Sequence, residues 1–238
     1  MFNPGAVGPL VDGWRAPPVP DLAPMAGAWV ELAPLTPGHA AALWSAVAGD
    51  DGLWTYMAVG PFPDAAGFAA WVAQVSAGAD PQFWAIRPKG GDWAGVASYL
   101  RIDPAHGAIE VGNILFSRTL QGTPAATEAM ALMMARAFGL GYRRYEWKCN
   151  ALNLPSRRAA QRLGFSFEGV FRQHMIIKGR NRDTAWFSIT DADWPRLKAA
   201  YDRWLDPANF DAEGRQRVAL SDLTRGIGAP DPAVTAQG

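Results

Sequence analysis

The segment spanning residues 110–165 contains side chains whose types and spacing suit anion binding and acid–base chemistry. Gln121, Gly122 and Thr123 form a turn directly before Pro124, where a helix is predicted to begin. Thr is favoured as the residue that caps a helix, and Pro suits the first helical turn because it has no N–H group to leave unpaired. Free backbone N–H groups at a helix start, with the positive end of the helix dipole, bind anions such as a diphosphate. The same turn would also serve as an ordinary connection between a strand and a helix.

Further polar candidates stand at both ends of this segment. Glu110 lies in an otherwise apolar strand pattern over residues 109–116, which Gly112 interrupts. A Gly inside a strand pattern indicates a bulge or a close approach of the backbone. Asn153 and Ser156 stand at the start of a short predicted helix, where they would either cap the helix or face a bound ligand.

The turn resembles a motif of the GCN5-related N-acetyltransferase (GNAT) family. In that family a Gln/Arg-x-x-Gly-x-Gly/Ala loop holds the pyrophosphate of acetyl-coenzyme A (acetyl-CoA). Gln121, Pro124 and Ala126 occupy the three motif positions in this sequence. Pro124 replaces the middle glycine and removes one N–H donor. The amides of Gly122, Thr123, Ala125 and Ala126 remain as expected donors.

A second motif strengthens the resemblance. Asn153, Ser156 and the sequence Leu163-Gly164-Phe165 are similar to the family's Asn-x-x-Ser/Ala and Gly-Phe segment, in which the Asn contacts the pantetheine region. The sequence Gln-Gly-Thr-x-x-Ala-Thr-Glu-Ala, which begins at Gln121, is most similar to the RimJ/RimL-like branch of ribosomal-protein N-terminal acetyltransferases. The resemblance covers roughly residues 28–195.

The resemblance implies a set of residues that contact acetyl-CoA. In the family two neighbouring strands splay apart, so that the pantetheine arm adds along one strand edge. Here those strands would be 109–116 and 143–149. Mobile cations at Arg118, Arg157 and Arg158 would reach the phosphates or remain solvated surface groups. The implied cofactor-binding residues are Asn113, Ile114, Leu115, Gln121, Gly122, Thr123, Ala125, Ala126, Asn153, Ser156 and Arg158.

The implied reaction is direct transfer of the acetyl group to a primary amine, at a protein N-terminus or on a small-molecule or aminoacyl acceptor. It requires a neutral amine, a donor to the thioester oxygen and a proton for the leaving thiolate. Glu110 is the expected general base and Ser156 the expected general acid, since Ala160 stands where many family members have a Tyr. The competing class is a non-catalytic acyl-CoA-binding module, which would keep the turn and Asn153 without depending on Glu110.

The loop over residues 49–63 is the expected wall of the acceptor pocket. Trp54, Tyr56 and Phe62 lie in it, and its sequence resembles a run in the RimJ/RimL-like branch. Together with Glu110 these aromatic residues form the predicted substrate pocket. Packing in the core is the alternative for the same rings.

Composition limits the other classes of function. Apolar residues make up 49% and charged residues 18% of the 238 residues, which is typical of a globular protein. The 22 basic and 22 acidic residues argue against nucleic-acid or anionic-membrane partners. The single Cys149 and three scattered His residues predict no metal site and no intramolecular disulfide. No apolar run approaches the ~20 residues of a membrane span, and we expect a cytoplasmic protein. A homodimer stays open.

The order of the elements predicts the fold class. Strands at 82–88, 93–102 and 109–116 precede a strand–helix–strand unit, which indicates an α/β (α+β) fold with a mixed, mostly antiparallel sheet and helices on both faces. A turn at 179–182 and a strand at 183–190 are expected near the end. The predicted domains are an extended Pro-rich arm (1–27), an acetyltransferase domain (28–205) and an extension (206–238), whose residues from 226 onward are expected to be disordered with few anchors.

Overall fold

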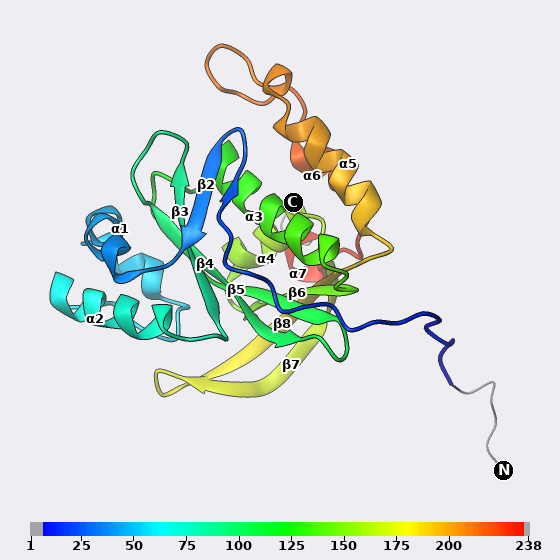
Figure 1. Ribbon diagram of the computed structural model, residues 1–238, viewed down its shortest axis with the longest axis horizontal. Helices are drawn as coiled ribbons and strands as arrows, with labels where there is room; N and C mark the ends of the chain where they lie inside the picture. Colours follow the sequence, from blue (N-terminus) through cyan, green and yellow to red (C-terminus); the bar gives the residue numbers. More distant parts are fainter. Residues whose placement is uncertain (1–6, 236–238) are drawn as a thin grey trace.

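A single eight-stranded sheet runs through the computed structural model, which describes residues 7–235 (Figure 1). The strand order is β1-β2-β3-β4-β5-β6-β8-β7. All neighbouring strands are antiparallel except β5 and β6, which are parallel. The strands are β1 (Met25–Ala26), β2 (Val30–Pro34), β3 (Gln82–Pro88), β4 (Gly95–Asp103), β5 (Ala108–Phe116), β6 (Arg144–Asn150), β7 (Ser166–Ile177) and β8 (Arg180–Thr190). The predicted mixed, mostly antiparallel sheet is confirmed.

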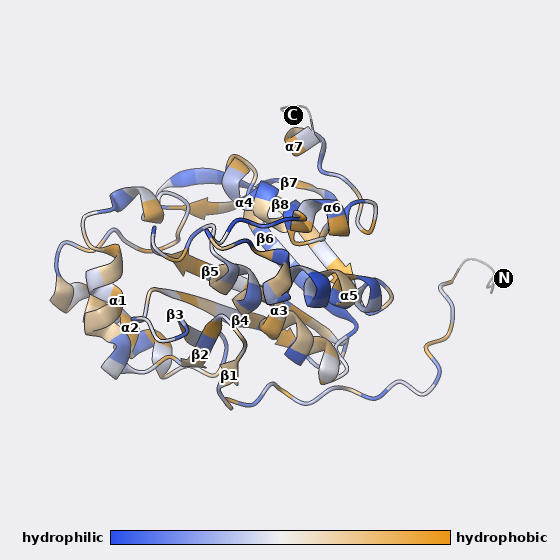
Figure 2. Cartoon of the chain, turned by 90° about the horizontal axis from the view of Figure 1, so that it is seen from above, coloured by the Kyte–Doolittle hydropathy of each residue, from blue (hydrophilic) through white to orange (hydrophobic). Residues whose placement is uncertain are grey.

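Helices cover both faces of this sheet, as Figures 1 and 2 show. Side chains alternate along a strand, so each strand feeds two cores. Trp84 on β3 packs with the cluster around α3, whereas Phe83 and Ala85 pack with the cluster around α1 and α2. The helices are α1 (Ala40–Val47), α2 (Ala65–Ser76), α3 (Pro124–Gly139), α4 (Leu154–Arg162), α5 (Trp194–Leu205), α6 (Leu220–Thr224) and α7 (Pro232–Thr235).

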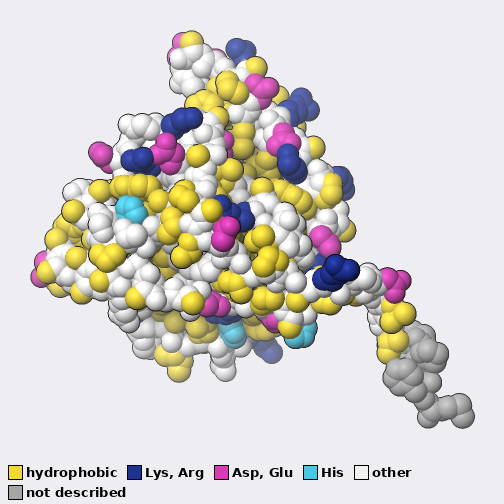
Figure 3. All heavy atoms as spheres, viewed as in Figure 1, with side chains coloured by type: hydrophobic (Ala, Val, Ile, Leu, Met, Phe, Trp, Pro, Cys, Tyr) yellow, Lys and Arg dark blue, Asp and Glu magenta, His cyan; other side chains and the backbone are white. Residues whose placement is uncertain are grey.

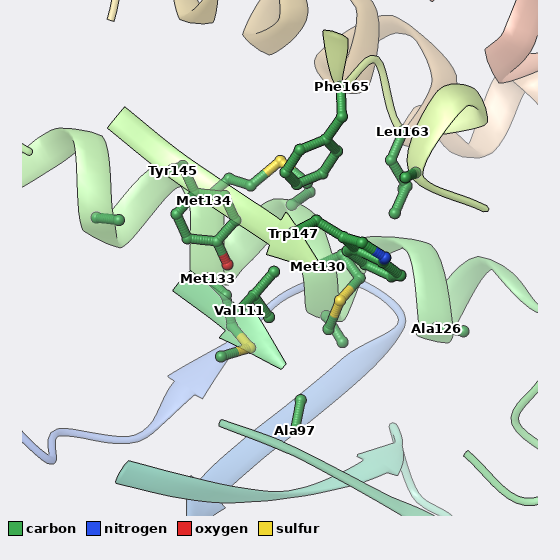
Figure 4. Close-up of a cluster of buried hydrophobic side chains, with 14 of the residues drawn as sticks. Ala97, Val111, Ala126, Met130, Met133, Met134, Tyr145, Trp147, Leu163 and Phe165 are labelled. Atoms are coloured by element: carbon green, nitrogen blue, oxygen red, sulfur yellow. The ribbon is translucent and has the colours of Figure 1, made fainter. Parts of the chain in front are cut away.

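The longest helix, α3, is held by a core rich in methionine (Figure 4). Met130, Met133 and Met134 are at most 2% exposed and lie against the sheet beside Tyr145. The Tyr99 hydroxyl donates to the carbonyl of Met133 at 2.7 Å, which ties β4 to the helix. This packing fixes the position at which α3 begins, and therefore the turn before it.

The hairpin between β7 and β8 is tighter than predicted. Its turn consists of Lys178 and Gly179, with φ of 50° and 72°, rather than residues 179–182. Two successive residues with positive φ match the right-handed twist of the flanking strands, so a two-residue turn joins them directly. The strand β8 accordingly begins at Arg180, three residues before the expected start at Asp183.

The C-terminal extension is anchored, and the expectation of few anchors from residue 226 onward is wrong for 226–235. The carbonyl of Ala229 accepts from the N–H of Phe167 at 3.0 Å. Asp231 is fully buried and binds Arg157 through two 2.6 Å contacts. One buried carboxylate thus fixes a segment whose composition gives no such signal. Residues 236–238 lie outside the described part of the chain.

The N-terminal arm contains no helix or strand over residues 7–24. The carbonyl of Pro20 accepts from Nε2 of Gln82 at 3.0 Å, and the guanidinium of Arg143 lies 6.0 Å from the ring centre of Trp14. The part of the expected arm formed by residues 1–6 is not described.

Acidic and basic side chains are interspersed over the face in Figure 3. Within residues 7–235, no helix combines the length and apolar character that crossing a membrane requires.

Replacing Asp231 by Asn should lower the free energy of unfolding by about 3–5 kcal/mol, because it leaves Arg157 buried without its counterion. Urea denaturation measures the change. Asp222→Asn is the matched control, since Asp222 forms only an exposed ion pair with Arg225. Equal stability losses in the two variants would contradict the role assigned to the buried pair.

Candidate active site

The two parallel strands at the centre of the sheet separate. They pair at only four positions, from Ala108 with Arg144 to Val111 with Trp147. Beyond these pairs β5 continues to Phe116 and β6 to Asn150 with no further pairing between them. The expected splayed strand pair is therefore confirmed, and it leaves strand edges facing a gap.

A bulge in β5 lies at the start of this gap. Val96 of β4 pairs with Leu115 and Ser98 pairs with Gly112, so β5 contains one extra residue between the two pairs. Asn113 has a φ of 51°, and its Nδ2 donates to the Ser98 hydroxyl at 2.9 Å. Asn is one of the few residues that adopt this conformation readily. The bulge thus follows the Gly112 that indicated it.

The bulge also reverses the faces of the strand. Ile109 and Val111 pack with the α3 cluster, but Leu115 packs with the α1 and α2 cluster. The expectation that these three side chains share one face is wrong, because one added residue shifts the alternation. The peptide groups of Asn113 and Ile114 consequently lie where the strand changes face and the gap opens.

The turn before α3 is open to solvent. Gly122 has a φ of 74°, and a Cβ atom placed on it would meet no atom within 4 Å. Thr123 caps the helix, since its Oγ1 accepts from the N–H of Ala126 at 3.2 Å. The backbone N–H of Thr123 donates to the carbonyl of Leu120 at 3.4 Å.

The cap reduces the set of expected amide donors. The N–H groups of Gly122 and Ala125 donate to no described residue, whereas those of Thr123 and Ala126 are engaged. The prediction of four available amides is thus corrected to two. Gln121, the first motif residue, donates from Nε2 to the carbonyl of Phe116 at 2.7 Å and so braces the turn.

The start of α4 brings Asn153 and Ser156 to the margin of β6. Asn153 Oδ1 accepts from the N–H of Ser156 at 3.2 Å, which is a helix cap. The hydroxyl of Ser156 plays no part in this cap and instead accepts from Nε1 of Trp147 at 3.0 Å. Burial raises the pKa of the nearby Cys149 thiol, and a hydrogen bond from Ser156 and the charge of Arg157 partly offset that rise.

Glu110 is a buried carboxylate. It is 3% exposed, and its Oε2 contacts Nη1 of Arg101 at 2.6 Å and Nζ of Lys148 at 2.9 Å. Its Oε1 makes no hydrogen bond to a described residue. This oxygen lies 3.4 Å from the position that a Cβ atom on Gly112 would occupy. One oxygen is therefore held by two cations, and the other points toward the bulge.

The cations continue into a network across the outer face of β6, β7 and β8. Nζ of Lys148 also contacts Glu146 at 2.7 Å, and Arg144 joins Glu146 to Glu168 through 2.6 Å contacts. Burial acts to raise the pKa of Glu146, but hydrogen bonds from Lys148 and Arg144 outweigh it and lower that pKa. The hydrogen bonds from Arg144 are the main reason why the pKa of Glu168 is lowered. The site therefore contains charges that are fixed by one another.

The aromatic loop is divided between the two expected roles. Trp54 is 2% exposed and packs against Phe62 and Trp71, so core packing is the outcome for Trp54 and Phe62. The hydroxyl of Tyr56 donates to the carbonyl of Leu152 at 3.1 Å. The loop thus reaches the connection before α4 through Tyr56, the member of the predicted pocket that remains exposed.

Two of the cations expected near phosphates are paired with carboxylates. Arg157 is buried against Asp231, and Arg118 contacts Asp50 at 2.6 Å. The role of Arg157 as a mobile phosphate ligand is wrong. Arg158 is exposed on α4 and remains a candidate.

Sequence reasoning missed Arg101, Lys148 and Arg182. Period-two alternation was a usable signal for Lys148, because Tyr145 and Trp147 face α3 and residues 146 and 148 must face the other way. Arg101 is brought to Glu110 by the β4–β5 register, which has no local signature. No group of three His, Cys, Asp or Glu side chains placed to hold a metal ion occurs within residues 7–235.

Comparison with solved structures identifies close structural relatives. A GCN5-related N-acetyltransferase from Brucella melitensis is 45% identical, with a TM-score of 0.87 and coverage of 89% of this chain and 98% of that chain. A GNAT-family acetyltransferase from Chromobacterium violaceum ATCC 12472 is 42% identical, with a TM-score of 0.76 and coverage of 82% and 98%. A comparison with curated protein sequences found no match.

More distant structures share the fold. The microcin C7 self-immunity acetyltransferase MccE, solved with acetyl-CoA and AMP, is 22% identical at a TM-score of 0.62, over 69% of this chain and 93% of that chain. The RimL ribosomal L7/L12 α-N-protein acetyltransferase is 21% identical at a TM-score of 0.61, over 69% and 91%. At this identity the likeness shows the fold alone, so the RimJ/RimL-like branch remains a prediction.

A family model described as the acetyltransferase (GNAT) domain matches residues 30–166. This match spans β2 to the start of β7 and includes the turn, the bulge and both splayed strands. The chain belongs to the GNAT family of acetyltransferases.

Proposed function

We propose that this protein transfers the acetyl group of acetyl-CoA to a primary amine by direct attack of the amine on the thioester. The observation that carries the proposal is the separation of β5 and β6 beyond Val111 and Trp147, next to an open turn at a helix start. A strand edge with unpaired peptide groups suits an extended amide-containing chain such as pantetheine. The solved complex of MccE with acetyl-CoA supports the use of this fold for that cosubstrate.

The turn would hold the diphosphate of the cosubstrate. The free N–H groups of Gly122 and Ala125 and the dipole of α3 supply the attraction for an anion. Asn153, at the start of α4, would contact the pantetheine arm on the β6 side. Thr123, Ala126 and Gln121 would act indirectly, because their groups shape the turn.

The chemistry would take place at the bulge. Oε1 of Glu110 accepts a proton from the attacking amine, directly or through one water molecule. Backbone N–H groups of residues 113–115 donate to the thioester oxygen as its charge develops. As the new C–N bond forms and the C–S bond breaks, the Ser156 hydroxyl gives its proton to the leaving thiolate. Arg101 and Lys148 hold Glu110 through its other oxygen and stabilise its charge.

Coenzyme A should raise the melting temperature of the protein by mass action. Gly122→Asp should weaken this binding about tenfold or more, because a carboxylate at the turn repels the diphosphate. Gly122→Asn is the matched control, since Asn has the same size and meets the same positive φ without the charge. Calorimetric titration compares the two variants. Absence of any thermal shift with the wild-type protein would refute both the transferase and a non-catalytic acyl-CoA-binding module.

Glu110→Gln should lower kcat for thiol release from acetyl-CoA by about 10²–10⁴-fold, the usual contribution of a general base. Binding of coenzyme A should persist, because the turn is untouched. Glu168→Gln is the control, since it alters the far end of the same charge network. An unchanged kcat in Glu110→Gln would remove Glu110 from the mechanism, and binding without any amine-dependent thiol release would favour the non-catalytic module.

Ser156→Ala should lower kcat most for acetyl-CoA and less for an acetyl donor whose leaving thiolate is less basic, because the better leaving group needs less help from an acid. A purely structural role would lower both rates equally. The comparison is made with acetyl-CoA and an activated aryl thioester under saturating amine.

A further inference from the structure

Arg182 is a partly buried cation on the outer face of the sheet and has no counterion among the described residues. Arg182 lies on β8, and neither a hydrogen bond nor an ion pair connects its guanidinium to any described residue. Its Nε is buried without a partner, and burial lowers the pKa of Arg182. A buried N–H group without an acceptor lowers stability. Such a group is expected where a ligand supplies the missing acceptor.

The position of Arg182 relates it to the gap. Thr184, Trp186 and Ser188 of β8 pair with the last three outward-facing positions of β6, and Arg182 lies one step beyond them. Alternation along β8 places Arg182 on the same face as Trp186. Arg182 also interacts electrostatically with Glu110 and with Cys149, which lies on the splayed part of β6. It therefore lies within electrostatic range of Glu110, on the outer face of the sheet.

The carboxylates on this face are already paired with other cations. Glu110, Glu146 and Glu168 are each already bound to at least one of three cations, namely Arg101, Lys148 and Arg144. Arg182 is not bound to any of these three carboxylates. The neighbouring Asp183 does not neutralise it, since its Oδ1 accepts from the N–H of Gln173 and from Nδ2 of Asn181.

A second unpaired donor accompanies Arg182. Nε1 of Trp186, two residues along the same face of β8, is buried without an acceptor. Lys148 lies 3.9 Å from the centre of the Trp186 ring and Phe171 lies 4.6 Å from it, so the indole is held in place. Two N–H donors of one strand face thus lack acceptors close to the proposed base.

We infer that the acceptor is a primary amine that also carries a carboxylate, and that Arg182 binds this carboxylate while Glu110 receives the proton of the amine. The inference rests on the proposed transferase function. A guanidinium binds a carboxylate through two parallel hydrogen bonds, which would orient the acceptor as well as hold it. A polyamine is disfavoured, because its second cation would meet Arg182, Arg101 and Lys148.

Matched acid and amide acceptors test this assignment. Thiol release from acetyl-CoA is measured with a panel of amino acids and dipeptides, each beside its C-terminal amide. The acids should exceed the amides in kcat/KM by about tenfold or more, the effect of a charge-assisted hydrogen-bond pair. Arg182→Gln should bring the acids down to the level of the amides, and Arg182→Lys should restore part of the preference. Arg180→Gln, at an exposed position of the same strand and face, is the control and should keep the preference.

The outcomes separate this inference from the proposed function. Equal rates for acids and amides, or an equal loss for both in Arg182→Gln, would overturn the role of Arg182 and leave the transferase standing. No thermal shift with coenzyme A would instead remove the transferase itself. If no member of the panel is acetylated, the same acids are titrated onto the complex with coenzyme A. A rise in melting temperature that Arg182→Gln abolishes supports the site, and the absence of any Arg182-dependent rise overturns it.

Discussion

The short parallel pairing of β5 and β6 is the constraint on which the rest of the structure depends. Parallel strands need a crossover connection, and α3 provides it by packing its methionine-rich side on the sheet. The helix therefore begins beside the end of β5, and the gap opens on the same side. An open helix start and an unpaired strand edge are thus brought together by topology and not by an additional loop.

The bulge at Asn113 gives this gap two chemically different sides. Before the bulge, Glu110 faces the outer, charged surface, whereas Ile109 and Val111 face α3. After it, Leu115 faces α1 and α2. Because of one extra residue, β5 changes face close to the point where its pairing with β6 ends. The buried carboxylate of Glu110 lies just before this point. The Ser98 hydroxyl, which contacts both Asn113 and the carbonyl of Gly112, holds this conformation.

Local signals in the sequence predicted the elements well, because they depend on neighbouring residues. Thr123 with Pro124 marked a helix start that the structure confirms through its cap. Strand β3 was predicted with its observed bounds. The tight turn at Lys178 and Gly179 was missed because a Lys residue gives no indication in the sequence that its φ will be positive.

The long-range ion pairs were not predictable in the same way. Arg157 and Asp231 are separated by 74 residues, and Arg101 meets Glu110 only through the register of two strands. A charged residue carries the same local signal whether it ends in solvent or in a buried pair. The predicted catalytic pair, Glu110 and Ser156, came from the family resemblance, and the structure adds the partners that define what each group is free to do.

The contact between Arg157 and Asp231 also has a consequence for how the molecule is made. The chain leaves the ribosome from its N-terminus, so α4 emerges well before the carboxylate that neutralises its buried arginine. During that interval the β6–α4 connection, which Arg157 holds through the carbonyl of Ala151, lacks its final support. Burial of Arg157 with its counterion is therefore among the last contacts of this domain that synthesis makes available.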